Sequence, residues 1–260
     1  MTRNRPQREF PATGRLVTAM DDRIVRVARL IADEPARTGD RGGVAGVLRR
    51  LCSAAERAMS AHGVGVSVMA DEGMRGVAAV SEPSYEPLEE LQFTLGEGPC
   101  LDAFATRRPV LVPDLSDGAM RRWPGYAPAL HDRGVRAVFA FPLQIGAARI
   151  GALDVFRDEP GSLTAGEFRD ALTFADVAVT TLLDGQAQAP PGTAADGLDE
   201  VIEQRAELFQ AQGMVAVQLG ISLTDAMARL RAYAYAQDKA LGEVARDVVA
   251  RRLSFDSGHP

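Results

Sequence analysis

Residues able to do chemistry are few in this sequence, and they do not cluster. The two cysteines, Cys52 and Cys100, provide neither a disulfide framework nor a group of metal ligands. Cys100 follows Gly98 and Pro99 at the expected start of a helix, a position that can lower the pKa of a thiol and raise its reactivity. Burial as an inert structural thiol is the other interpretation, and it is the commoner fate of cysteine. Cys100 is therefore a candidate redox residue.

The other chemically useful patterns are incomplete. None of the three histidines, His62, His131 and His259, lies in a metal-binding spacing. The segment Gly96-Glu97-Gly98 lacks the lysine and the spacing of a phosphate-binding loop. A Walker loop, a Gly-x-Ser-x-Gly elbow and a Cys-x-x-Cys pair do not occur in the sequence. We therefore expect no enzymatic activity, no metal and no cofactor.

Charge is unevenly distributed near the C-terminus, and this bears on nucleic-acid binding. Residues 196–219 hold five acidic side chains against Arg205 alone, whereas residues 223–253 hold six basic and four acidic side chains. RNA binding needs positive charge on the face that meets the phosphates, so the second segment is the better candidate. Tyr233 and Tyr235 suit stacking on unpaired bases, and they suit packing at the edge of a helical bundle equally well. An ordinary solvated face is the alternative for the basic residues.

Both segments are predicted to be helical. Apolar residues recur at helical spacing from Leu198 and end at Gly220, and Ser222 with Asp225 then forms a capping-box pattern that begins a second helix. A third helix is expected over residues 241–253. The pattern predicts an all-α three-helix module. The apolar face of its second helix should consist of Leu223, Ala226, Met227, Leu230 and Ala234.

Short phrases of this module keep a specific order and spacing: Gln210-Ala-Gln-Gly-Met214, Ser222-Leu-x-Asp-Ala226, Leu230-Arg-x-x-Ala234 and Leu241-x-x-Val-Ala245. In these phrases the module resembles the ANTAR family, which consists of RNA-binding antitermination modules of bacterial regulators. The resemblance implies that a homodimer binds tandem stem-loops in nascent RNA, and it implies no binding to DNA. The RNA contacts that we expect are Arg205, Gln212, Arg229, Arg231, Tyr233 and Arg246.

The residues before this module mix helical and strand patterns. Amphipathic helices are expected at 17–32 and 44–60, and they suit pairing with each other or with a second subunit. Another helix is expected at 122–132. A capping-box pattern of Thr164 and Glu167 predicts a further helix at 164–183. This order predicts an antiparallel sheet with flanking helices, an α+β domain. The expected strands are 63–70, 75–81, 109–113, 135–143 and 149–156.

Four phrases of this domain are distinctive: Leu95-Gly-Glu-Gly-Pro-Cys100, Pro109-Val-x-Val-x-Asp-Leu115, Gly134-Val-x-Ala-x-x-Ala-x-Pro-Leu143 and Ile150-Gly-Ala-Leu-Asp154. They are similar to the GAF family of sensory and dimerising modules, which implies a small-molecule pocket on one face of the sheet. The signature of cyclic-nucleotide GAF domains is absent, so the ligand is not identified. The expected lining is Leu101, Phe104, Trp123, Phe139 and Phe141, all of which suit the core equally well.

Composition sets the general class of the chain. Its 260 residues are 46% hydrophobic and 25% charged, which predicts globular folding. The net charge of −6 argues against a protein coated with positive charge for non-specific nucleic-acid binding. No apolar run is long enough to cross a bilayer, and the N-terminus has no hydrophobic signal core. We expect a soluble, cytoplasmic protein without membrane contacts.

These patterns predict two domains joined by a short linker that contains Pro190 and Pro191. The predicted function is transcription antitermination through RNA hairpins, controlled by the sensory domain. The alternative is a ligand or redox sensor that acts through protein contacts, with the helical module as a dimerisation element. The predicted segments are a disordered arm (1–16), a helical extension (17–43), the GAF-like domain (44–184), the linker (185–195), the ANTAR-like domain (196–254) and a tail (255–260).

Overall fold

The computed structural model describes residues 13–36, 42–69, 75–189 and 199–255, with the side chains of 13–21, 75 and 199–205 left out. One five-stranded antiparallel sheet organises the larger domain, in the order β2-β1-β5-β4-β3. Its strands are β1 Gly63–Met69, β2 Arg75–Val80, β3 Val110–Val112, β4 Ala137–Ile145 and β5 Ala148–Arg157. All five predicted strands are present, and the α+β prediction is confirmed.

The strands have alternating side chains that build a different core on each face of the sheet. On β4, Phe139, Phe141 and Leu143 lie in one core cluster, whereas Val138 and Ala140 lie in another. The same alternation on β5 separates Leu153 from Asp154. Each face of the sheet therefore has its own set of helices.

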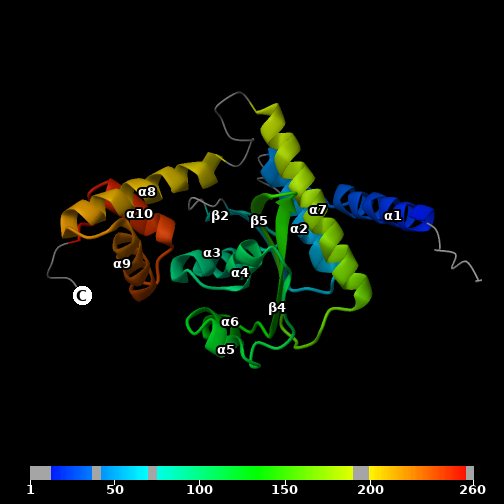
Figure 1. The fold of residues 1–260 in the computed structure, drawn as a ribbon, viewed down its shortest axis with the longest axis horizontal. Coiled ribbons are helices and arrows are strands. Elements are labelled where there is room, and N and C mark those ends of the chain that lie inside the picture. Colours follow the sequence, from blue (N-terminus) through cyan, green and yellow to red (C-terminus); the bar gives the residue numbers. More distant parts are fainter. Residues whose placement is uncertain (1–12, 37–41, 70–74, 190–198, 256–260) are drawn as a thin grey trace, which may run out of the picture.

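Two long helices, α2 Gly43–Ala58 and α7 Ala165–Gln188, cover the first face, and α1 Thr13–Ala32 packs on the outside of both (Figure 1). The capping box that begins α7 is confirmed, because Thr164 accepts a hydrogen bond from the Glu167 N–H and the Glu167 carboxylate accepts one from the Thr164 N–H. Asp170 of α7 forms an ion pair with Arg23 at 3.0 Å and also pairs with Arg26, which holds α1 against α7.

Short helices cover the other face: the 3-10 turn Pro83–Tyr85, α3 Glu86–Leu95, α4 Pro99–Thr106, α5 Ala119–Arg122 and α6 Tyr126–Asp132. The predicted helix at 122–132 is divided here into α5 and α6. Pro124 disfavours helical backbone at the residue before it, and Trp123 accordingly leaves the helical region with φ −131° and ψ 77°. Trp123 and Tyr126 are buried in the core between these helices and the sheet.

The C-terminal module consists of α8 Asp199–Leu219, α9 Leu223–Ala236 and α10 Leu241–Val249, as the three-helix prediction required. Gly220 ends α8 with φ +64°. Ser222 caps α9 by accepting from the Asp225 N–H, but the Asp225 carboxylate accepts from the Ser222 hydroxyl instead of completing a reciprocal box. The core of the module contains Ala211, Val215, Ala226, Leu230, Ala234, Leu241, Val244, Ala245 and Val248.

Some predicted boundaries and faces differ from the structure. Leu223 was expected on the apolar face of α9, but it is 57% exposed because it lies at the first residue of the helix, beyond the buried row that begins at Ala226. Residues 13–16 of the predicted disordered arm are helical in α1, and residues 1–12 lie outside the described part. α7 continues to Gln188, so the predicted linker begins too early.

The C-terminal module lies against the α3 side of the larger domain (Figure 1). Helix α9 contacts α3, α10 also contacts α3, and α8 contacts β2. In the ranges that the structure describes, no helix combines the length and the apolar character that a membrane span requires.

Candidate functional site

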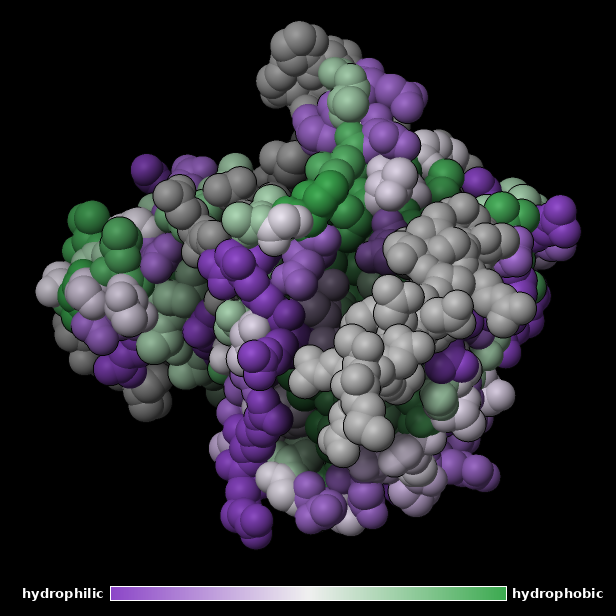
Figure 2. All heavy atoms as spheres, turned by 45° about the vertical axis from the view of Figure 1, so that its right-hand side comes forward, coloured by the Kyte–Doolittle hydropathy of each residue, from purple (hydrophilic) through white to green (hydrophobic). Residues whose placement is uncertain are grey.

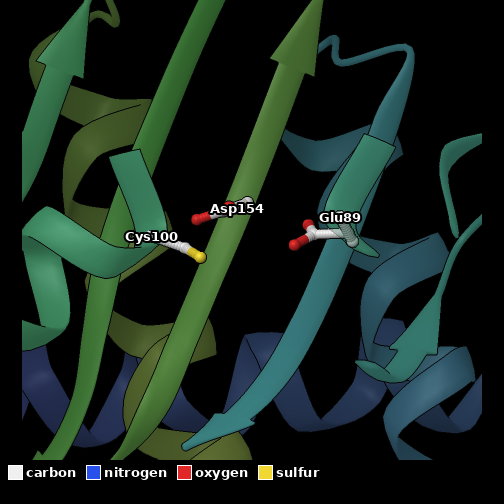
Figure 3. A group of neighbouring side chains, drawn as sticks. All are labelled: Glu89, Cys100 and Asp154. Atoms are coloured by element: carbon white, nitrogen blue, oxygen red, sulfur yellow. The ribbon is translucent and has the colours of Figure 1, made fainter. Parts of the chain in front are cut away.

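A cluster of buried polar side chains lies between the sheet and the helices α3 and α4 (Figure 3). Glu89 reaches it from α3 and Asp154 from β5, and both are fully or almost fully buried. Gly65 on β1 leaves room for Glu89, because a Cβ at this glycine would lie 2.1 Å from the Glu89 Oε1 atom. Any side chain at position 65 would therefore displace the Glu89 carboxylate from this position.

Neutral donors hold the two carboxylates. The Gln92 Nε2 atom donates to Asp154 Oδ2 at 2.7 Å and, at 3.4 Å, to Glu89 Oε2. The Ser67 hydroxyl donates to Glu89 Oε2 at 3.1 Å. Gln92 lies three residues after Glu89, so both side chains leave α3 on the same face.

The loop between α3 and α4 completes the cluster. Gln92 Oε1 accepts a 2.9 Å hydrogen bond from the Cys100 N–H, which positions the buried Cys100 at the beginning of α4. A carboxylate oxygen of Glu89, one of Asp154 and the Cys100 Sγ atom all lie within 4.8 Å of one another. In Figure 3, Glu89 and Cys100 approach from opposite sides the strand that carries Asp154.

Tyr126 belongs to the same region. The backbone N–H groups of Gly125 and Tyr126 donate to Glu97 Oε1 at 2.6 and 2.9 Å, which fixes the beginning of α6 on the Gly96–Gly98 loop. The Tyr126 ring is fully buried, and its hydroxyl has no hydrogen-bond partner. This loop thus positions a tyrosine.

Burial dominates the electrostatics of the cluster. It raises the pKa of Glu89 well above the usual range, and the neighbouring Asp154 raises it further. Burial also raises the pKa of Asp154. The pKa of Tyr126 is raised by burial and then by the nearby Glu89, Asp154 and Cys100. The cluster therefore disfavours two negative charges at once unless a proton or a cation is present.

Sequence reasoning found only part of this cluster. It singled out Cys100 and included Asp154 in a family phrase, but it missed Glu89, Gln92 and Tyr126. A usable signal was present in β5, because Asp154 is the one acidic residue in an otherwise apolar stretch from Ile150 to Phe156. Cys100 is fully buried, as expected for the structural alternative.

The five predicted pocket residues do not come together. Phe139 and Phe141 lie in the core beneath α2 and α7, whereas Trp123 lies in the core on the opposite face. Leu101 and Phe104 pack at the edge of a third cluster that contains Cys100. The pocket prediction is wrong as a common lining, because the odd-numbered residues of β4 point away from α4.

The predicted RNA contacts divide into accessible and engaged side chains. Arg229 and Arg246 are exposed on α9 and α10. Gln212 is partly buried, and its Nε2 atom donates to the Leu223 carbonyl at 2.8 Å, which ties α8 to the beginning of α9. Tyr233 packs edge-on against Phe255 with ring centroids 5.4 Å apart, as the packing alternative required. The side chain of Arg205 lies outside the described residues.

Arg231 faces the larger domain. A Cβ at Gly96 would lie 2.6 Å from the Arg231 Nη1 atom, so the guanidinium sits directly on the loop after α3. Next to this contact, a groove of about 750 Å³ runs between the two parts of the chain. Leu91 and Asp132 line one side of it, and Tyr235 and Lys239 line the other. One predicted RNA contact thus belongs to the interface between the domains.

Comparisons with known proteins agree with this architecture. The family model of the GAF domain matches residues 43–182, and that of the ANTAR domain matches residues 196–249. The GAF domain of a phosphoenolpyruvate-protein phosphotransferase from Coxiella burnetii has 15% identity and a TM-score of 0.48, covering 66% of this chain and 96% of that one. Free methionine-R-sulfoxide reductase from Neisseria meningitidis, solved with its substrate, has 17% identity and a TM-score of 0.42, covering 66% and 93%.

No curated protein matches the sequence significantly. The GAF model alone spans more than half of the 260 residues. GAF and ANTAR domains are regulatory domains. The chain belongs to the GAF domain family, and its GAF domain is followed by an ANTAR domain.

Proposed function

We propose that this regulator prevents transcription termination by binding RNA stem-loops through its ANTAR domain, under the control of its GAF domain. The observation that carries the proposal is the packing of α9, which bears Arg229 and Arg231, against α3 of the GAF domain. The helix expected to meet RNA is thereby also the helix that meets the sensory domain.

The exposed basic residues supply the RNA-binding part of the proposal. Arg229 and Arg246 are available to phosphates, whereas Lys239 and Arg252 both pair with Asp247, at 3.2 and 2.9 Å. Tyr235 is 56% exposed and is the better placed of the two tyrosines for stacking on an unpaired base. We assign the initial RNA contact to Arg229, Arg246 and Tyr235.

The position of Arg231 supplies the regulatory part. An RNA that uses Arg231 competes with Gly96 and its loop for the same guanidinium. Docked and released forms of the ANTAR domain then differ in RNA affinity, and a signal that favours one form shifts the balance. Because α3 carries Glu89 and also contacts α9, it connects the buried cluster to the ANTAR domain.

A homodimer is part of the proposal, and α1 and α7 are its expected interface. Exposed hydrophobic residues of these helices include Ile24, Val25, Leu172 and Leu183, which are 38–50% exposed. Figure 2 turns the side of the molecule with α1 and α7 forward and shows green, hydrophobic residues there among hydrophilic ones. A second copy of the chain would cover these residues and place two ANTAR domains in one particle.

RNA binding is tested by fluorescence anisotropy with a tandem stem-loop RNA at several salt concentrations. Binding should weaken as salt increases, and replacing both Arg229 and Arg246 with Ala should reduce the logarithmic salt slope by roughly 0.7–0.9 per lost phosphate contact. Arg108→Ala, at an exposed arginine of the GAF domain, is the control. Absence of salt-dependent binding at low ionic strength would rule the proposal out. Loss of the dimer in the double variant, measured by sedimentation, would favour a dimerisation role for the module.

A further inference from the structure

The buried cluster contains oxygen atoms that no donor group in the described part of the chain satisfies, and Glu89 and Asp154 can hydrogen-bond each other only if they share a proton. Glu89 Oε1, Asp154 Oδ1 and the Tyr126 hydroxyl are all inaccessible to solvent and have no hydrogen-bond partner. A buried polar atom without a partner destabilises the folded chain, and a native structure that contains three in one region calls for an explanation. A missing ligand that accepts lone pairs from the two carboxylates would remove part of this destabilisation.

The charge of the cluster indicates the sign of that ligand. Glu89 and Asp154 are hydrogen-bonded by Ser67 and Gln92, which are neutral. The phenol of Tyr126 and the thiol of Cys100 can each add a negative charge but never a positive one. A cation therefore fits this site and an anion does not.

The geometry is compatible with a small metal ion. The oxygen atoms of Glu89 and Asp154 and the sulfur of Cys100 lie within 4.8 Å of one another, so some point lies no more than about 2.8 Å from all three. Typical Zn–O and Zn–S distances are about 2.0–2.3 Å. Side-chain shifts of less than about 1 Å would bring the three atoms to bonding distance.

The donor atoms select the class of metal. Mg²⁺ and Ca²⁺ prefer oxygen ligands alone, whereas a thiolate combined with carboxylates suits Zn²⁺ or Fe²⁺. We propose that Glu89, Cys100 and Asp154 bind a divalent transition-metal ion of this class. Ser67 and Gln92 are then positioning residues, because they hydrogen-bond the carboxylates that bind the metal. This site does not depend on RNA binding by the ANTAR domain.

The sequence did not predict this site, because its ligands are dispersed over 66 positions from Glu89 to Asp154, counting both ends. Only the antiparallel neighbours β1 and β5, with α3 and α4 above them, bring the ligands together. The second cysteine, Cys52, lies in the core on the other face of the sheet and donates to the Ala79 carbonyl. It is therefore a matched buried thiol that takes no part in the site.

The test uses the full chain and cobalt as a spectroscopic probe. After chelator treatment, titration with Co²⁺ should reach one equivalent per chain and produce a thiolate-to-cobalt charge-transfer band, which Zn²⁺ then removes. Cys100→Ser should abolish the band, and Cys52→Ala should leave it unchanged. Glu89→Gln and Asp154→Asn should each weaken Co²⁺ affinity more than Ser67→Ala, for which roughly 10–100-fold is expected.

Replacing the carboxylates with neutral amides also distinguishes the loss of a metal ligand from a failure to fold. Because they remove charge from a buried site, Glu89→Gln and Asp154→Asn should leave the metal-free chain folded, as circular dichroism would show. Absence of Co²⁺ binding to the wild-type chain would overturn the proposal and leave a carboxyl pair that shares a proton. A charge-transfer band that survives Cys100→Ser would overturn it as well.

Discussion

The side-chain amide of Gln92 donates a hydrogen bond of 2.7 Å to Asp154 across the space between α3 and β5. Gln92→Glu keeps the oxygen that accepts from the Cys100 N–H but removes the donor and adds a third carboxyl to the cluster. We expect the free energy of unfolding to decrease by about 1–3 kcal/mol, and by more at pH 8 than at pH 5, because the added carboxyl ionises at the higher pH.

Urea unfolding of the metal-free chain at the two pH values measures this effect. Gln218→Glu is the control, because Gln218 also accepts a backbone hydrogen bond, from the Phe255 N–H at 3.0 Å, but does so at the surface. It should change stability little at either pH. Equal effects of the two substitutions would show that the cluster does not penalise charge.

The contact of Gly96 with Arg231 allows the docking of the ANTAR domain to be changed in both directions. Gly96→Asp places a carboxylate beside the guanidinium and should hold α9 on α3, whereas Gly96→Lys should repel it. Gly96→Asn has the same left-handed backbone, φ +74°, without added charge. We expect slower amide exchange in α9 for Asp than for Asn, and faster exchange for Lys, as hydrogen-exchange mass spectrometry would report.

RNA affinity should be lowest for Gly96→Asp, higher for Gly96→Asn and highest for Gly96→Lys. Gly118→Asp is the control for a general effect of added negative charge on RNA affinity. Gly118 is also a left-handed glycine, with φ +80°, and no atom lies within 4 Å of the new Cβ. If both aspartates reduce RNA affinity equally, docking on α3 does not control the ANTAR domain.

Local sequence patterns were sufficient for most of the elements but not for the buried cluster. The strands, the start of α7 at Thr164 and the end of α8 at Gly220 follow from alternation and capping, which involve neighbours in the chain. The position of Glu89 depends instead on Gly65, which is distant in the sequence and makes room for it. The predicted pocket lining failed for a related reason, since Phe139 and Phe141 lie on one face of β4 whereas Trp123 packs against the other.

The contact of Arg231 in the ANTAR domain could not be predicted from local sequence patterns either. The charge of Arg231 and its place on α9 were predicted, but its contact with Gly96 depends on how the two domains pack. No local pattern specifies such a contact. Charge counting therefore selected α9 and α10 as the candidate RNA-binding helices, whereas the accessible subset, Arg229 and Arg246, required the structure.

The capping box of α7 predicts how acid affects stability. Burial alone would raise the pKa of Glu167, but hydrogen bonds from Thr164 and the Arg157 guanidinium outweigh it and lower the pKa below its usual 4.5. Its contribution to stability is therefore complete above pH 4.5 and is lost as the pH falls through the lower, folded-state pKa. Glu167→Gln retains the capping pattern without the charge, so it should flatten this part of the pH profile.

Urea unfolding of the wild type and of Glu167→Gln between about pH 3 and pH 6 tests this prediction. Thr164→Ala should lower the free energy of unfolding by about 1 kcal/mol throughout this pH range, because it removes the hydroxyl that accepts from the Glu167 N–H. A wild-type profile parallel to that of Glu167→Gln would mean that Glu167 has the same pKa in both states.

Thiol chemistry distinguishes a structural Cys100 from a redox sensor. Cys52 and Cys100 are both fully buried, and burial followed by Glu89 and Glu56 raises the pKa of Cys52. The native chain should therefore react with a thiol reagent at pH 8 only as fast as it opens, and both thiols should become available in denaturant. Ser116→Cys provides an exposed thiol as the positive control. One fast-reacting thiol in the native chain that disappears in Cys100→Ser would instead make Cys100 accessible to oxidants and favour the redox-sensor alternative.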